Sequence, residues 1–158
     1  MIILIKKVLK YLFYLFLPLV IGLVSSSFTS NASGFYNSLK QPPLAPPGYL
    51  FGIVWTILFI LMGISFLLLK LKTEGYDISN TEFWYYLQLI INFFWSFFFF
   101  KNQELTFSFI WLVFLFITVI ITYRKFYKLY RPSAYLLIPY ILWIIFAGYL
   151  NLSVAILN

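Results

Sequence analysis

The side chains in this sequence that are best suited to bind a ligand are amides and aromatic rings within long apolar stretches. Gln88, Asn92 and Trp95 are spaced four and three residues apart, so in a helix they lie on one face. An amide in hydrocarbon needs a hydrogen-bond partner, because an unpaired one costs several kcal/mol. That partner is either a neighbouring helix, as is common between membrane helices, or a bound ligand. The spacing leaves both alternatives open.

A second stripe of this kind occurs near the end of the chain. Tyr140, Trp143, Ala147 and Asn151 are spaced three, four and four residues apart, which again predicts one helix face. The small side chain of Ala147 leaves room among its larger neighbours. That room serves either a neighbouring helix or a bound molecule.

The groups that conventional catalysis needs are scarce. The 158 residues include no His, no Cys and only four carboxylates. Disulfides, thiolate or imidazole metal sites and Ser–His or Cys–His nucleophile pairs are therefore excluded. All the carboxylates lie between or at the ends of the apolar stretches, which argues against a proton- or ion-coupled pump. We expect a binding protein rather than a conventional enzyme, with no metal site and no required cofactor.

The composition indicates lipid as the solvent. Hydrophobic residues make up 63% of the chain, aromatic residues 24% and charged residues only 9%, whereas soluble domains are about 25% charged. The net charge is +7, but the cations cluster in short runs between apolar stretches, as charges that flank membrane spans do. We therefore expect an integral membrane protein that contacts the lipid bilayer and no nucleic acid.

The apolar stretches are long enough for five membrane-spanning helices, since one span needs about 20 apolar residues. The sequence predicts an all-α, single-domain bundle over residues 1–158, with spans at about 8–28, 49–69, 83–100, 105–123 and 133–157. Long apolar runs without turn signals favour helices over the short alternating strands of a barrel. The first span has no clean signal-peptide cleavage site after it, so we interpret it as a retained helix. Pro139 is expected to kink the last span.

The charges also predict an orientation in the cell membrane. Nine of the eleven Lys and Arg residues fall on one side of the predicted spans. The positive-inside rule then gives a cytoplasmic N-terminus, with the C-terminus and the first loop outside. This loop, residues 29–48, contains two pairs of prolines and several apolar side chains. Because loops of this length are usually functional or disordered, we interpret it as an ordered lid rather than a flexible tether.

The candidate residues lie at similar depths below the outer ends of their predicted spans. With about 1.5 Å of rise per residue, most of them fall in the outer half of the bundle and one falls near its middle. The outer set is Tyr36 on the lid, Trp55, Asn92, Trp95, Ala147 and Asn151, and Trp143 is the deeper one. This predicts a cavity under the lid, lined by aromatic faces and amides, which suits a flat and largely apolar ligand. The pattern assigns no role to Trp111.

Four ordered motifs make this sequence resemble the tryptophan-rich sensory protein family, the bacterial relatives of the mitochondrial translocator (peripheral benzodiazepine receptor) protein. The resemblance covers residues 18–158. The motifs are Phe35-Tyr36-x-x-Leu39 with Pro42 and Pro46-Pro47, Phe51-Gly52-x-x-Trp55-Thr56, Gln88-Leu89-x-x-Asn92-x-x-Trp95-Ser96, and Pro139-Tyr140-x-x-Trp143-x-x-Phe146-Ala147-x-x-Leu150-Asn151.

The resemblance implies a five-helix bundle that binds porphyrins, haem-related tetrapyrroles and benzodiazepine-type ligands in a cavity closed by the first loop. By position, it implies a pocket lined by Tyr36, Trp55, Asn92, Trp95, Trp143, Ala147 and Asn151. It also implies homodimers and a receptor or carrier role in tetrapyrrole transport or stress sensing. An alternative implied function is light-dependent degradation of protoporphyrin, in which Trp55 and Trp143 exchange electrons with the excited ring.

Overall fold

The structure is a computed structural model that describes residues 2–29 and 32–158, with side chains from residue 5 onwards. Throughout these described residues the regular structure is helical, without strands. The elements are α1 (Ile2–Ser27), α2 (Ala32–Ser38), α3 (Gly48–Lys72), α4 (Ser79–Ser96), the π-helix η1 (Phe97–Lys101), α5 (Leu105–Leu129), α6 (Arg131–Tyr135) and α7 (Ile138–Leu157). Five segments of the described chain are long and apolar enough to cross a membrane. The predicted all-α membrane fold with five spans is therefore confirmed.

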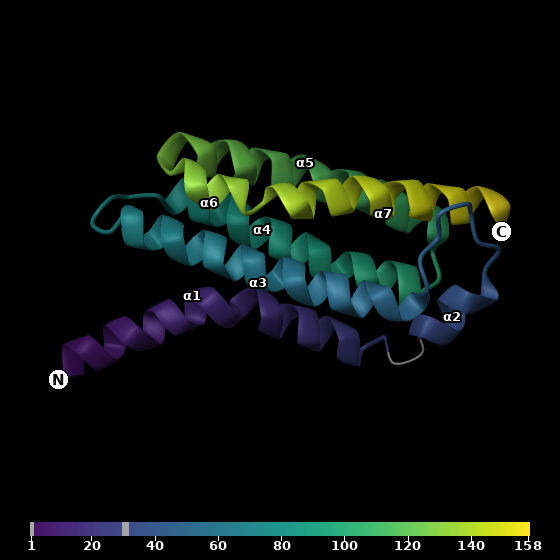
Figure 1. Ribbon diagram of the computed structural model, residues 1–158, viewed down its shortest axis with the longest axis horizontal. Helices are drawn as coiled ribbons and strands as arrows, with labels where there is room; N and C mark the ends of the chain where they lie inside the picture. The colour runs from purple at the N-terminus through teal and green to yellow at the C-terminus, as the bar shows by residue number, and fades with distance from the viewer. Residues whose placement is uncertain (1, 30–31) are drawn as a thin grey trace.

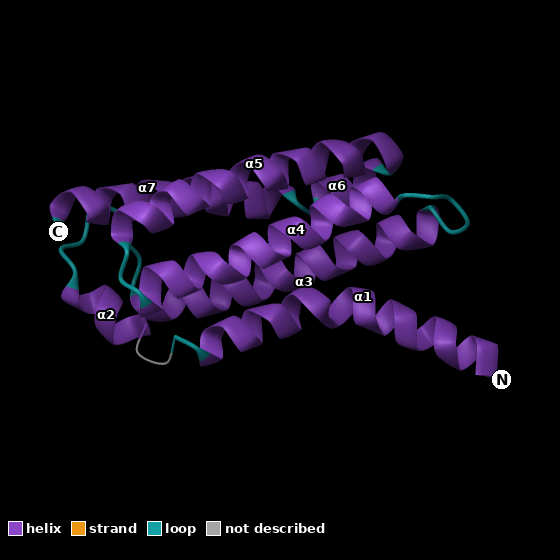
Figure 2. Ribbon diagram, turned by 180° about the vertical axis from the view of Figure 1, so that it is seen from behind, coloured by secondary structure: helices purple, strands orange, loops and turns teal. Residues whose placement is uncertain are grey.

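The helices run side by side along one long axis (Figure 1). α1 packs on α3 and α4, and α5 packs on α4 and α7. The N-terminus and the C-terminus lie at opposite ends of the bundle, as an odd number of spans requires (Figures 1 and 2). The short helix α2 lies at the C-terminal end of the bundle, near the end of α7.

α1 approaches α3 most closely near its middle and diverges from it towards both ends (Figure 1). Pro18 lies inside α1, where its ring and missing N–H bend a helix. At the point of approach, a Cβ atom on Gly63 of α3 would overlap the backbone carbonyl of Leu15. Only glycine allows the two backbones to come this close. The divergence leaves space between α1 and α3 on either side of this contact.

The connection between α3 and α4 is built from local turn chemistry. Gly75 adopts a φ of 88°, a left-handed conformation that glycine tolerates without strain. The Asp77 carboxylate accepts a hydrogen bond of 2.9 Å from the Ser79 backbone N–H at the start of α4, and this bond lowers the pKa of Asp77. An ion pair between Lys70 and Glu82 joins the two helices beside the turn. These contacts fix the end of the bundle where the N-terminus lies.

The predicted spans differ from the observed helices mainly at their ends; α5, for example, continues to Leu129 instead of ending at residue 123. Two spans differ further. The span expected at 133–157 is divided into α6 and α7, because Pro139 in the first turn of α7 has no N–H to continue a helix from α6. The span expected at 83–100 begins earlier, at Ser79, and ends in η1. Within η1, Phe99 is buried and Phe100 lies in the wall of a cavity.

Candidate functional site

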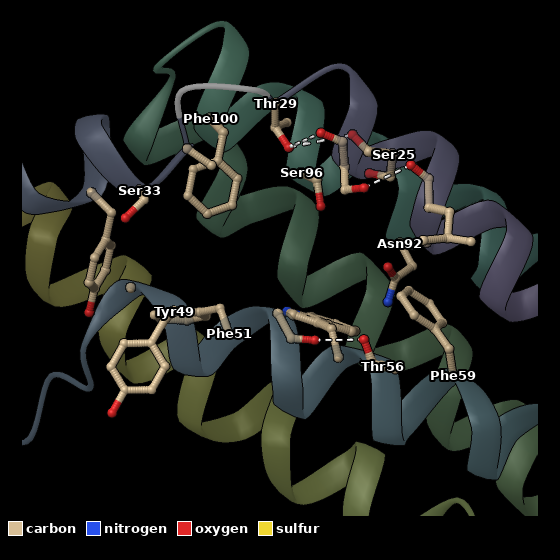
Figure 3. Close-up of a pocket in the computed structure, with 18 of the residues that line it drawn as sticks. Ser25, Thr29, Ser33, Tyr49, Phe51, Thr56, Phe59, Asn92, Ser96 and Phe100 are labelled. Atoms are coloured by element: carbon tan, nitrogen blue, oxygen red, sulfur yellow. Dashed lines mark hydrogen bonds between the residues drawn. The ribbon is translucent and has the colours of Figure 1, made fainter.

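A cavity of about 440 Å³ lies where α1 and α3 diverge towards the C-terminal end of the bundle. This volume falls within the range of about 300–1,000 Å³ that is typical of small-molecule sites. Five elements contribute to it: α1, α2, α3, α4 and η1 (Figure 3). Its lining residues are Leu19, Gly22, Leu23, Ser25, Ser26, Thr29, Ala32, Ser33, Tyr36, Gly48, Tyr49, Phe51, Gly52, Trp55, Thr56, Phe59, Asn92, Ser96 and Phe100.

Small residues help to keep this space open. A Cβ atom on Gly52 would meet no atom of the described residues within 4 Å, so this glycine borders open space in the described structure. Gly22 of α1 lies directly against the Phe59 ring, where a Cβ atom would collide with it. Small residues allow helices to pack closely, and Gly22 both makes such a contact and lines the cavity.

One wall of the cavity is aromatic. The Trp55 ring stacks on Phe59 with centroids 5.5 Å apart and planes inclined by 29°. The same ring lies 6.0 Å from the Trp95 ring. The Phe51 ring contacts Tyr36 edge-to-face at 5.0 Å. Faces of this kind can stack on a flat conjugated ligand, because aromatic pairs prefer offset or edge-to-face contact.

Hydroxyl groups line the opposite wall. Ser25 and Thr29 come from α1 and the residues after it, and Ser96 comes from α4 (Figure 3). Thr29 donates its hydroxyl hydrogen to the Ser26 carbonyl at 3.1 Å, which leaves its oxygen able to accept. None of the lining residues in the described part of the chain is charged. The cavity therefore offers aromatic surface and neutral hydrogen-bonding groups.

Asn92 connects the cavity to a buried polar network. Its amide nitrogen donates to the Tyr140 hydroxyl at 2.7 Å, and Tyr140 donates to the Gln88 carbonyl oxygen at 3.0 Å. The Gln88 amide points in turn to the sulfur of Met62 at 3.9 Å. Within the described residues, the Asn92 Oδ1 atom accepts no hydrogen bond. Both roles left open by the spacing are thus compatible here, because one end of the amide joins helices and the other is available to a ligand.

Asn151 serves the packing between helices. Its carbonyl oxygen accepts hydrogen bonds from Trp95 Nε1 at 3.2 Å and from the Ser108 hydroxyl at 3.1 Å. Its amide nitrogen donates to the Leu105 carbonyl at 2.8 Å. Together with Ala147 and Trp95, it borders a second void of only about 10 Å³. These three candidates therefore lie beside the main cavity rather than in its wall.

Trp143 lies further away, next to a shallow groove between α3 and α7. Its ring is 5.8 Å from Phe51, which separates it from the cavity. The reason is helical geometry: at 3.6 residues per turn, Trp143 is rotated by about 60° from Tyr140, whereas Ala147 and Asn151 return to within about 20° of it. A spacing of three, four and four residues thus includes one position that points away from the rest.

The structure shows how Trp111 packs between helices. Its indole N–H donates to the Ile91 backbone carbonyl at 2.8 Å, which joins α5 to α4. The ring packs edge-to-face against Phe98 at 5.0 Å and Phe94 at 6.4 Å. Trp111 is therefore a contact between helices on the far side of α4 from the cavity.

Comparison with known proteins agrees with this architecture. Residues 14–157 match the TspO/MBR family, a span that includes every residue lining the cavity. The chain belongs to the TspO/MBR family.

Individual TspO/MBR relatives align over nearly the whole chain. The tryptophan-rich protein TspO of Chlorobaculum tepidum is 35% identical over 157 residues, which cover 97% of this chain and 98% of that protein. The tryptophan-rich protein TspO of Archaeoglobus fulgidus is 33% identical, covering 96% of this chain and 99% of its own length. The translocator protein of Bos taurus is 28% identical, covering 85% of this chain and 82% of that protein. The chain is thus a multi-pass membrane protein of the TspO type.

In this TspO/MBR chain, the segment between α1 and α3 is fastened to the end of α7. The Lys40 backbone N–H donates to Asn158 Oδ1 at 2.9 Å, and the Tyr149 hydroxyl donates to the Pro43 carbonyl at 2.8 Å. Tyr36, in α2, is only 5% exposed and lines both the cavity and the small void beside it. Burial raises the pKa of its hydroxyl, which has no hydrogen-bond partner among the described residues.

Several lining residues of this TspO/MBR cavity are absent from the sequence-based candidates. Ser25 and Thr29 follow the apolar part of α1, and their clustering at the end of a span was the available signal. Ser96 follows Trp95 directly in the third motif. Phe100 lies four residues after Ser96 and eight after Asn92, so the same helical spacing was the available signal for it.

Proposed function

We propose that this chain is a membrane receptor or carrier that binds porphyrins and related tetrapyrroles, and benzodiazepine-type ligands, in the cavity between α1, α3 and α4. One observation supports this most strongly. The Trp55 ring and the Asn92 amide, from different spans, line the same cavity of about 440 Å³. The motifs of the TspO/MBR family contain both residues, and the family match covers them.

The cavity chemistry suits a tetrapyrrole. Such a molecule is flat and mostly apolar, with pyrrole N–H groups at its centre and, in protoporphyrin, carboxylates at one edge. Trp55 and Phe59 offer aromatic faces for stacking on the ring. The free oxygen of Asn92 can accept a hydrogen bond from an N–H group, and the Ser25 and Ser96 hydroxyls of the opposite wall can donate to carboxylates.

The open side of the cavity lies between α1 and α3. The residues along it are exposed: Leu23 and Ser26 on α1, and Tyr49, Gly52 and Thr56 on α3. Both helices are membrane spans, so a ligand dissolved in the bilayer can enter from the side. By the positive-inside rule, this half of the bundle faces away from the cytoplasm, and the N-terminus is cytoplasmic. This access route fits transport or sensing of apolar tetrapyrroles.

Binding is tested by titrating the purified protein with protoporphyrin and following tryptophan emission. We expect saturable quenching, and we expect Asn92→Ala to weaken binding by about 3- to 10-fold, the equivalent of one hydrogen bond of about 0.5–1.5 kcal/mol. Tyr140→Phe is the matched control, since it breaks the Asn92–Tyr140 bond without altering a lining residue. If Asn92→Ala binds as wild type does, Asn92 is no part of a binding site.

Light-dependent protoporphyrin degradation is the second candidate, because the Trp55 ring lines the cavity and has the Trp95 ring 6.0 Å away. Trp143 supports it less, since Phe51 lies between its ring and the cavity. Repeating the titration under illumination separates the two functions. A degrading protein bleaches protoporphyrin faster than buffer does and loses this effect in Trp55→Phe, whereas Trp143→Phe changes it less.

A further inference from the structure

A second cleft lies at the opposite end of α1, where its N-terminal half diverges from α3. The cleft encloses about 410 Å³ and is lined by α1 and by the residues around the α3–α4 connection. Four lysines face it: Lys6, Lys7, Lys10 and Lys70. One carboxylate, Glu74, faces it as well. It shares no lining residue with the cavity described above.

Tyrosine rings hold the ammonium groups around this cleft. The Nζ atoms of Lys10 and Lys70 lie 5.8 Å and 5.5 Å from the centroid of the Tyr14 ring. The Nζ atom of Lys7 lies 5.8 Å from the centroid of Tyr11. These are cation–π distances, which attract the ammonium groups to the ring faces. Two separate segments, α1 and the end of α3, thereby direct positive charge to one place.

The positive charge of the cleft is only partly balanced. Glu74 forms an ion pair with Lys7 at 2.9 Å, and Glu82 pairs with Lys70. Within residues 5–29 and 32–158, no carboxylate lies within ion-pair distance of Lys6 or Lys10. The pKa of Glu74 is lowered, mainly by its hydrogen bond and attraction to Lys7 and further by Lys10. An anion entering the cleft would meet two ammonium groups, those of Lys6 and Lys10, that have no carboxylate partner among the described residues.

We propose that this cleft binds the phosphate-bearing headgroup of an anionic phospholipid. Basic pockets between membrane helices on the cytoplasmic side bind such headgroups, and each lysine near an anionic surface adds to the attraction. Tyr14 lies one turn, about 6 Å, deeper along α1 than Lys10, at the depth where tyrosines meet the boundary between headgroups and acyl chains. Soluble phosphate esters share the chemistry of the headgroup, but they would not use the apolar surface of the tyrosine rings.

The test uses the full chain in a non-ionic detergent, titrated with phosphatidylglycerol or phosphatidylcholine and observed by native mass spectrometry. We expect one phosphatidylglycerol to be retained in preference to phosphatidylcholine. The double variant Lys6→Gln and Lys10→Gln should weaken its binding by about tenfold or more. Lys6→Arg with Lys10→Arg keeps the charge and should retain binding.

The matched control is Arg124→Gln with Lys128→Gln. These residues have the same four-residue spacing, are exposed, and lie near the end of α5 at the same end of the bundle, outside the cleft. Their loss should change phosphatidylglycerol binding by no more than about twofold. Equal losses of phosphatidylglycerol affinity in the two Gln double variants, or no loss in either, would overturn the proposal. So would glycerol 3-phosphate binding as tightly as phosphatidylglycerol, since the site would then belong to soluble phosphate esters. Unchanged protoporphyrin binding by the Lys6/Lys10 variant shows that it is folded.

Discussion

Replacing Gly52 by phenylalanine should weaken protoporphyrin binding by up to about 100-fold, because the new ring occupies the space that the ligand needs. A Cβ atom at Gly52 meets nothing within 4 Å in the part of the chain that the structure describes, and the residue lines the cavity. The unliganded protein therefore accommodates the side chain, and the substitution raises the free energy of the protein–protoporphyrin complex instead. Forcing extra atoms into an occupied site costs about 1–3 kcal/mol, which sets the size of the effect. Quenching of tryptophan emission measures the change in affinity.

Gly52→Ala is the control for this variant. A methyl group fills little of the cavity, and alanine is the better helix former by about 1 kcal/mol, so this variant should fold at least as well and bind nearly as wild type does. A thermal unfolding curve in detergent shows whether Gly52→Phe is folded. If folded Gly52→Phe binds protoporphyrin with wild-type affinity, the ligand does not occupy this cavity.

Replacing Gly63 by alanine should have the largest effect on stability. Its Cβ atom would overlap the Leu15 backbone carbonyl, and a backbone atom within a helix cannot move aside as a flexible side chain can. α1 must then move away from α3, at a cost of about 1–3 kcal/mol or more. The midpoint of thermal unfolding should fall by about 5–10 °C. Protoporphyrin binding should weaken as well, because α1 forms one wall of the cavity.

Gly52→Ala is the control for Gly63→Ala as well. Gly52 and Gly63 both lie within α3, and they differ in what faces them. We expect alanine to be tolerated at Gly52 and destabilising at Gly63. Equal unfolding midpoints for the two alanine variants would contradict the close approach of α1 and α3 on which both clefts depend.

The spans were predictable from sequence because membrane helices depend on length and hydrophobicity more than on partners. The ends of the helices were less predictable. The division of the last span into α6 and α7 follows from Pro139, whose presence indicates a kink without saying whether the helix bends or stops. The π-helix η1 lies in a run of phenylalanines, where no residue type marks the change of helical pitch.

The candidate site was predictable in part. Tyr36, Trp55 and Asn92 do line one cavity, since depth along a helix follows directly from residue number. The rotation of each helix about its own axis does not follow from residue number. The face of α7 that carries Ala147 and Asn151 therefore borders a nearly filled void, and Trp143 lies behind Phe51. The position of α1 was the main feature missing from the sequence-based cavity, although it provides the serine-rich wall.

The polar residues illustrate a second limit on what can be predicted from the sequence. Amides in hydrocarbon must find partners, which the sequence makes clear for both Asn92 and Asn151. Whether the partner is protein or ligand depends on what lies opposite. Asn151 meets Trp95, Ser108 and the Leu105 carbonyl, which use both ends of its amide. Among the described residues, Asn92 hydrogen-bonds to Tyr140 through its amide nitrogen, and its oxygen accepts no hydrogen bond.

The most direct test of the binding site locates the porphyrin among the five tryptophans, with variants that each keep one tryptophan and carry phenylalanine at the other four. At saturating protoporphyrin, we predict the strongest quenching of Trp55, which lines the cavity, and then of Trp95, 6.0 Å from it. Trp84, in the first turns of α4 at the far end of the bundle, should be quenched least. Stronger quenching of Trp84 or Trp111 than of Trp55 would contradict a tetrapyrrole site between α1, α3 and α4.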